Sequence, residues 1–77
     1  MPWIKIEKLL NEMAIHQNQK LLSYGQQIVP HLTADDLLQP NDFSQLELHP
    51  VFRYQEGVLA GIQAVQMALQ ALKNDEH

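Results

Sequence analysis

The sequence predicts an all-α fold: a long antiparallel helical hairpin with a short, partly helical connector, assembling into a four-helix bundle. Three observations predict it. Two stretches of more than twenty residues repeat apolar side chains at steps of three and four, which is the period of an amphipathic helix. Residues 30 to 50, which join them, carry three of the four prolines. Each stretch has apolar residues on more than one face, so a single hairpin would leave apolar surface in water.

The first helix is predicted over about residues 3 to 29. Pro30 ends it, because a proline lacks the N–H that continues a helix and disfavours helical geometry in the residue before it. A second apolar stripe lies roughly 100 to 140° around the helix from the main one. The main stripe consists of Trp3, Ile6, Leu10, Met13, Ala14, Leu21, Tyr24 and Ile28, and the second of Ile4, Ile15, Leu22 and Val29.

Gln17 interrupts the main stripe of this helix at mid-length. A buried amide at such a position can fix the register of two helices through a polar mate, such as Gln55 or a second copy of Gln17. The alternative is that Gln17 lies at the wet edge of the stripe. The sequence leaves both interpretations open.

Residues 30 to 49 are predicted to form the connector. Two helix-start signals fall in it, one running from Thr33 to Asp36 and the other a capping box from Ser44 to Glu47. The leucines of this segment are too numerous for a free linker, so we expect it to fold back over one end of the helices. Between Lys20 and Arg53 there is no basic residue, and four acids predict a negative surface: Asp35, Asp36, Asp42 and Glu47.

The second helix is predicted over about residues 50 to 73, with Pro50 at the first helical position and a frayed tail at 74 to 77. Two lines of side chains run along it. Large residues form a ridge, with Val51, Val58, Val65 and Leu72 seven residues apart and Ile62 and Leu69 beside them. Small residues form the second line, which we call the small-residue line: Gly57, Gly61, Ala64, Ala68 and Ala71.

The two glycines of this line need a reason, because each costs roughly 1 kcal/mol of helix stability relative to alanine. A line of small residues lets a second helix approach closely, and the added dispersion contacts can offset that cost. We therefore expect the small-residue line at or near the two-fold axis of a homodimer. The predicted interface residues are Gly57, Gly61, Ala64, Ala68, Ala71, Ile4, Ile15, Leu22 and Phe52. Phe52 is expected either to cover the connector or to meet the partner.

Size and composition exclude several classes of protein. Seventy-seven residues form one domain, and the lack of cysteine excludes disulfides and cysteine-based metal centres. A net charge of −4 with five basic residues argues against nucleic-acid binding. The N-terminus lacks the apolar run of a signal peptide, and the longest apolar segment is too short to cross a bilayer. A cytoplasmic location is expected.

The sequence offers little for catalysis. Ser23, Ser44 and Thr33 lie outside any nucleophile motif, and the adjacent Asp35 and Asp36 suit a helix start better than acid–base chemistry. The four histidines, His16, His31, His49 and His77, show no helical metal-site spacing. We therefore expect no enzyme, no cofactor and no small-molecule substrate.

The leading expectation is a small interaction or assembly module that works through apolar helix faces as a homodimer. One alternative is a chaperone-like protein or an obligate small subunit that binds another helical protein. The second alternative is a metal or small-ligand binding protein, in which His31 and His49 meet across the connector with Asp35, Asp36 or Glu47 nearby.

Overall fold

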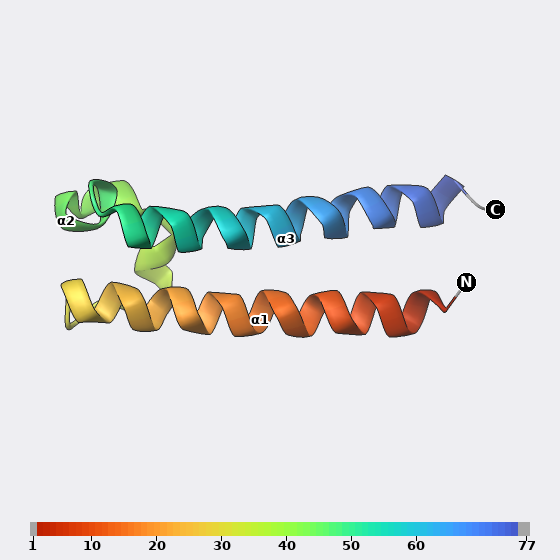
Figure 1. The fold of residues 1–77 in the computed structure, drawn as a ribbon, viewed down its shortest axis with the longest axis horizontal. Coiled ribbons are helices and arrows are strands. Elements are labelled where there is room, and N and C mark those ends of the chain that lie inside the picture. Colours follow the sequence, from red (N-terminus) through yellow and green to blue (C-terminus); the bar gives the residue numbers. More distant parts are fainter. Residues whose placement is uncertain (1, 76–77) are drawn as a thin grey trace.

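The computed structural model describes residues 2–75, which form an antiparallel helical hairpin (Figure 1). Helix α1 (Trp3–Ile28) and helix α3 (Pro50–Asp75) each contain 26 residues and lie side by side. The connector contains the 3-10 turns η1 (Asp35–Leu38) and η2 (Pro40–Asp42) and the short helix α2 (Ser44–Glu47). Within residues 2–75 there is no strand. The predictions of an all-helical protein and of a hairpin are confirmed.

The boundaries of the long helices follow from their terminal residues. α1 ends at Ile28, one residue earlier than predicted, because Val29 precedes a proline and is extended, with φ −124° and ψ 93°. α3 begins at Pro50 as predicted but continues to Asp75, two residues beyond the predicted end. Lys73 in its last turn suits the negative end of the helix dipole. The remainder of the predicted tail, residues 76 and 77, lies outside the described residues.

One of the two predicted helix starts in the connector forms as a reciprocal cap. The Thr33 N–H donates to Asp36 Oδ2 at 2.9 Å, and the Asp36 N–H donates to Thr33 Oγ1 at 3.3 Å. The prediction that Ser44 caps a helix is wrong. α2 begins at Ser44 itself, so Phe43 occupies the cap position, and no side chain caps the helix. The backbone oxygen of Phe43 accepts the N–H groups of Leu46 and Glu47.

Polar side chains fasten the connector to α3. Arg53 Nε donates to the backbone oxygen of Glu47 at 2.9 Å, and Arg53 Nη2 donates to Asn41 Oδ1 at 2.6 Å. Its third contact is an ion pair with Glu56 at 2.7 Å. A planar guanidinium can hold three such acceptors at once. His49 caps α3, since its Nδ1 accepts the Phe52 N–H at 3.3 Å.

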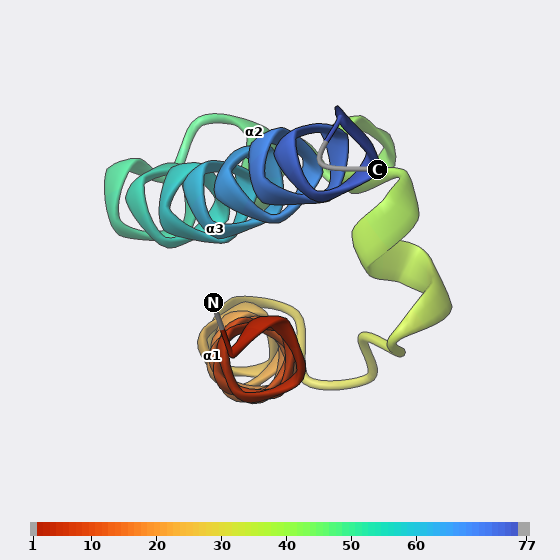
Figure 2. The ribbon, with the colours of Figure 1, turned by 90° about the vertical axis from the view of Figure 1, so that its right-hand side faces the viewer.

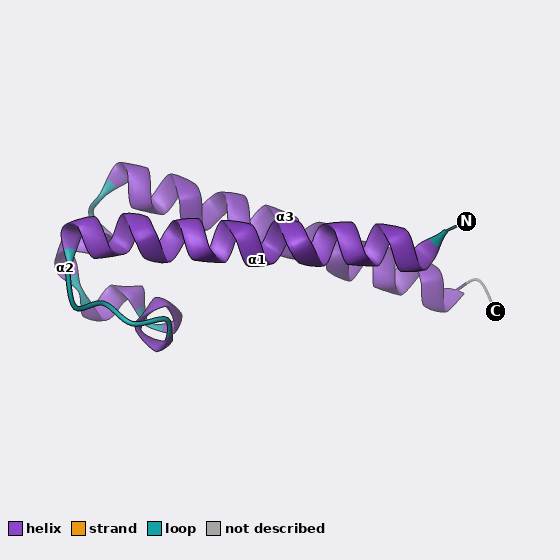
Figure 3. Ribbon diagram, turned by 90° about the horizontal axis from the view of Figure 1, so that it is seen from below, coloured by secondary structure: helices purple, strands orange, loops and turns teal. Residues whose placement is uncertain are grey.

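The apolar core lies at the connector end of the hairpin, which we call the closed end. Figure 2 looks along the hairpin and shows the connector to one side of the two long helices. Phe52 is at its centre and is 0% exposed. The connector lies on one flank of the two helices, and toward the chain termini no further element lies beside them in the described residues (Figure 3). The fully buried apolar residues are Leu21, Val29, Leu32, Leu46 and Phe52.

Gly25 provides the close approach in this core. A Cβ built on it would overlap Cδ2 of Leu32 and touch the ring of Phe52 at 3.5 Å. No described residue has a positive φ, so Gly25 is required by space and not by backbone conformation. Gly25 belongs to the main seam of α1, four residues after Leu21. This role was not predicted from the sequence, although the spacing of four residues from Leu21 is a signal for it.

Gln17 joins α1 to α3 midway along the hairpin. It is 6% exposed, and its Nε2 donates to the backbone oxygen of Gln55 at 3.0 Å and to the side-chain Oε1 of Gln55 at 2.8 Å. Of the two open interpretations, the structure supports the buried amide with Gln55 as its mate. A buried amide that is satisfied in only one arrangement fixes the register of the two helices.

A double-mutant cycle on Gln17→Ala and Gln55→Ala should give a coupling free energy of about 1 kcal/mol, because each single change breaks the same side-chain hydrogen bond. Urea unfolding followed by circular dichroism measures it. As a control, Gln17→Ala combined with Gln63→Ala should be additive, since Gln63 is exposed. Additivity of the Gln17 and Gln55 changes would contradict the assigned contact.

Candidate interaction surface

The small-residue line lies on the outer side of α3, directed away from α1. Its five residues are exposed, and a Cβ added at Gly57 or Gly61 would meet nothing within 4 Å. Within residues 2–75 no helix approaches them. The two glycines therefore lower the helix stability of the single chain, and no contact within the chain offsets that loss.

The other predicted interface residues divide into two groups. Ile4 and Ile15 project into solvent, at 80% and 51% exposure. Leu22 packs against the closed-end core, and Phe52 is wholly inside it. Phe52 thus takes the first of its two expected roles, which is to cover the connector, and it presents no surface to a partner.

The heptad residues of the ridge, Val51, Val58, Val65 and Leu72, do not form the line of α3 that faces α1, whereas Ile62 and Leu69 beside them belong to it. Phe52 is buried, and half-buried side chains at steps of three and four continue one seam from it along α3: Gln55, Leu59, Ile62, Gln66, Leu69 and Lys73. Arg53, Glu56 and Val58 are half-buried beside this seam. The ridge valines lie roughly 80° around the helix from this seam. Val51, Val65 and Leu72 consequently remain 45–48% exposed.

These ridge residues lie on the flank opposite the connector. Ala60 lines a groove together with the connector residues Ala34 and Leu37, so that side of α3 faces the connector. Val58 precedes Ala60 by two positions, which is a rotation of roughly 200° around the helix. Val58 therefore lies on the side of α3 that faces away from the connector. On α1, Met13 and Tyr24 lie on the bare side by the same spacing from Ile15 and Leu22. We name this surface the valine flank: Met13, Tyr24, Val51, Val58, Val65 and Leu72.

The valine flank is nearly free of charge. The carboxylates of α1 are Glu7 and Glu12, and those of α3 within the described residues are Glu56 and Asp75. By the helical period none of the four falls on this flank. Lys20, seven residues after Met13 and four before Tyr24, places one positive charge on the α1 part of the flank. A strip of half-exposed apolar side chains without carboxylates is typical of a surface that becomes covered by another protein.

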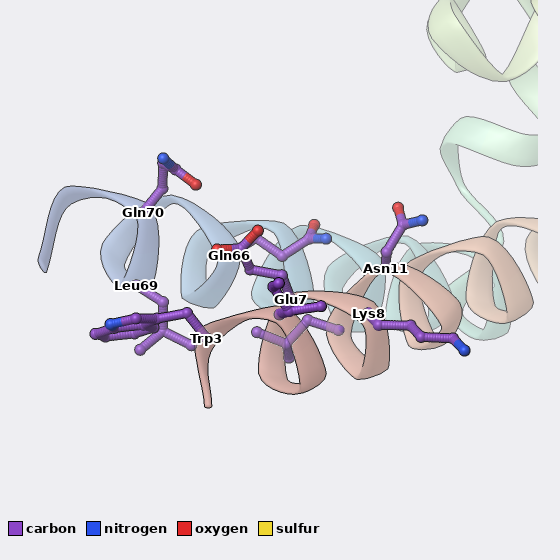
Figure 4. A pocket seen from close by; sticks show the side chains of 9 residues that line it. Trp3, Glu7, Lys8, Asn11, Gln66, Leu69 and Gln70 are labelled. Carbon is purple, nitrogen blue, oxygen red and sulfur yellow. The ribbon is translucent and has the colours of Figure 1, made fainter. Parts of the chain in front are cut away.

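A second recess lies at the chain-terminal end of the hairpin (Figure 4). It has a volume of about 520 Å³, and Trp3, Leu10 and Leu69 supply its apolar wall. Polar residues surround them, and Lys73 Nζ binds Glu7 Oε1 across the two helices at 2.6 Å. This mixed lining does not resemble a built ligand site, because none of the residues that line it is buried.

Residues 2–75 contain no group of three or more His, Asp or Glu side chains that could hold a metal ion. His31 is exposed, and Nδ1 of His49 is used as the cap of α3. His16 is exposed as the helical period indicates, and His77 lies outside the described residues. Among the described helices, none has the length and apolar character needed to cross a bilayer.

No protein-family model, curated protein or solved structure matches the chain.

Proposed function

We propose that the protein is a small non-enzymatic interaction or assembly module that acts through its apolar helix faces as a homodimer within a four-helix bundle. The observation that carries this proposal is that the hairpin exposes more surface than a compact monomer of its mass and keeps large apolar side chains half-exposed on it. The chain has an accessible surface of 5539 Å². A compact monomer of this mass exposes about 4,800 Å².

The shape of the hairpin accounts for this excess. The Cα radius of gyration is 14.9 Å and the extents are 46 × 19 × 17 Å. A compact domain of this length has a radius of gyration of about 11.5 Å. Because the core occupies the closed end alone, the rest of the helix length is a single layer of two rods, and large apolar side chains stay half-exposed along it. A partner that covers them would remove this unfavourable exposure.

A second candidate is a chaperone-like protein or an obligate subunit of a hetero-complex, which would use the same faces. Two exposed side chains favour this candidate. By the helical period Ile4 and Ile15 lie on the connector side of α1, and they stay exposed because the connector covers that side only near the closed end (Figure 3). The small-residue line remains a second proposed docking surface.

Site-specific photo-crosslinking tests the proposal. A photoreactive amino acid at Val65, Gly61 or Ile4 should give discrete protein adducts in the cells that make the protein, with adducts of the chain to itself if it is a homodimer. Glu12, on the outer side of α1 by the helical period, is the matched control and should give none. A lack of adducts at all three apolar positions would contradict an interaction role.

A further inference from the structure

We propose that the valine flank is the contact surface of a symmetric homodimer, in which the flank of one chain packs on the same flank of a second copy. This inference rests on the proposed function and specifies its partner and its surface. It assigns the interface to the side of the hairpin opposite the connector, and not to the small-residue line.

The area of exposed surface fits one further copy. The chain exposes about 700 Å² more than a compact monomer of its mass. A stable interface of standard size buries about 800 Å² on each partner. One isologous contact along the flank would therefore remove nearly all of the excess.

The pattern of side chains also fits a second copy of the same surface. Val51, Val58, Val65 and Leu72 repeat every seven residues, which is the spacing with which helices interlock side chains in bundles. In a two-fold contact the same residues supply both the knobs and the holes. The flank has no carboxylates, so two copies of this acidic chain meet there without juxtaposing their negative charges.

The small-residue line is a poorer surface for the same purpose. Its glycines and alanines bury little apolar area, and removal of apolar area from water is the driving force for association. The valines of the flank, by contrast, are large apolar side chains, and Val51 and Val65 are already about half covered within the chain. A second copy would complete their burial without moving either helix.

Sedimentation equilibrium of the full chain and of lysine variants tests the surface. The wild-type chain should be a dimer, and Val58→Lys combined with Val65→Lys should weaken the dimer at least about 100-fold, because two charges would have to be buried in the interface. Ala64→Lys combined with Ala68→Lys adds the same charge on the small-residue line and should leave the dimer unchanged. If the lysine variant of the flank loses its helical circular dichroism, Val58→Thr with Val65→Thr keeps the side-chain shape and should still weaken the dimer.

The outcomes distinguish the assignment of the surface from the proposed assembly role. A wild-type dimer that survives the flank changes but dissociates with Ala64→Lys and Ala68→Lys would overturn the assignment of the surface and retain the assembly role. A wild-type monomer at submillimolar concentration would overturn the second copy as partner. In that case adducts from Val65, Gly61 or Ile4 to a different protein would retain the interaction role, and their absence at all three positions would end it.

Discussion

Replacing Phe52 with alanine should lower the free energy of unfolding by about 3–5 kcal/mol, which is the usual cost of removing a fully buried aromatic ring. Phe52 is 0% exposed and packs among buried side chains from α1, the connector and α2. The closed end holds all of the fully buried apolar residues in the part of the chain that the structure describes. A cavity there therefore weakens a region where α1, the connector and α3 meet. For a domain of this size such a loss approaches the whole stability.

Urea unfolding followed by far-UV circular dichroism measures this effect. Tyr54→Ala is the matched control, because Tyr54 lies two positions further along α3 and is 68% exposed. Its replacement should change the free energy of unfolding by no more than about 0.5 kcal/mol, as surface changes do. Equal effects of the two substitutions would show that the closed-end core does not hold the hairpin together.

The helices were predictable because their signals are local. The period of apolar residues and the positions of Pro30 and Pro50 define both rods to within two residues. The Ser44 cap was wrong because a Ser-x-x-Glu pattern fits a helix that starts at Ser44 as well as one that starts after it. The local sequence does not distinguish the two, and the choice depends on how Phe43 and Leu46 pack.

The rotation of α3 against α1 was less visible in the sequence. An apolar ridge normally faces the neighbouring helix, but the seam of α3 includes Gln55, Gln66 and Lys73, which no hydrophobic pattern marks. The Gln17–Gln55 hydrogen bonds and the burial of Phe52 define this rotation, and the exposed Lys73–Glu7 ion pair agrees with it. The heptad residues Val51, Val65 and Leu72 are thereby left half-exposed. The candidate surface is thus set by contacts on a different face of the same helix.

Glycines were also judged by local sequence, and the structure separates their roles. Gly57 and Gly61 attract attention because they interrupt a strong helical pattern, yet nothing in the described chain approaches them. Gly25 lies among polar residues near the end of α1 and interrupts no apolar pattern, yet Leu32 packs directly on it. Which glycine is needed for packing depends on residues that the turn brings close to it. Helix propensity, which depends on the local sequence, does not contain that information.

Leucine substitutions at Gly25 and Gly61 should therefore have opposite effects on the free energy of unfolding. Gly25→Leu should lower it by about 3 kcal/mol or more, because four added carbons must enter a core already filled by Leu32 and Phe52. Gly61→Leu should raise it by about 0.5–1 kcal/mol, because leucine is the better helix former and its Cβ meets open space.

Urea unfolding of the two variants below the concentration at which the chain associates measures these effects, since binding of a second chain would add to the apparent stability. Sedimentation of the same variants at higher concentration tests the contact surface.

If the valine flank is the contact surface, Gly61→Leu leaves the association of the chain unchanged, because Gly61 lies on the outer side of α3. Loss of association in that variant, with its raised stability retained, would return the interface to the small-residue line. A stable Gly25→Leu variant would instead require that α1 and the connector pack less closely than the structure shows.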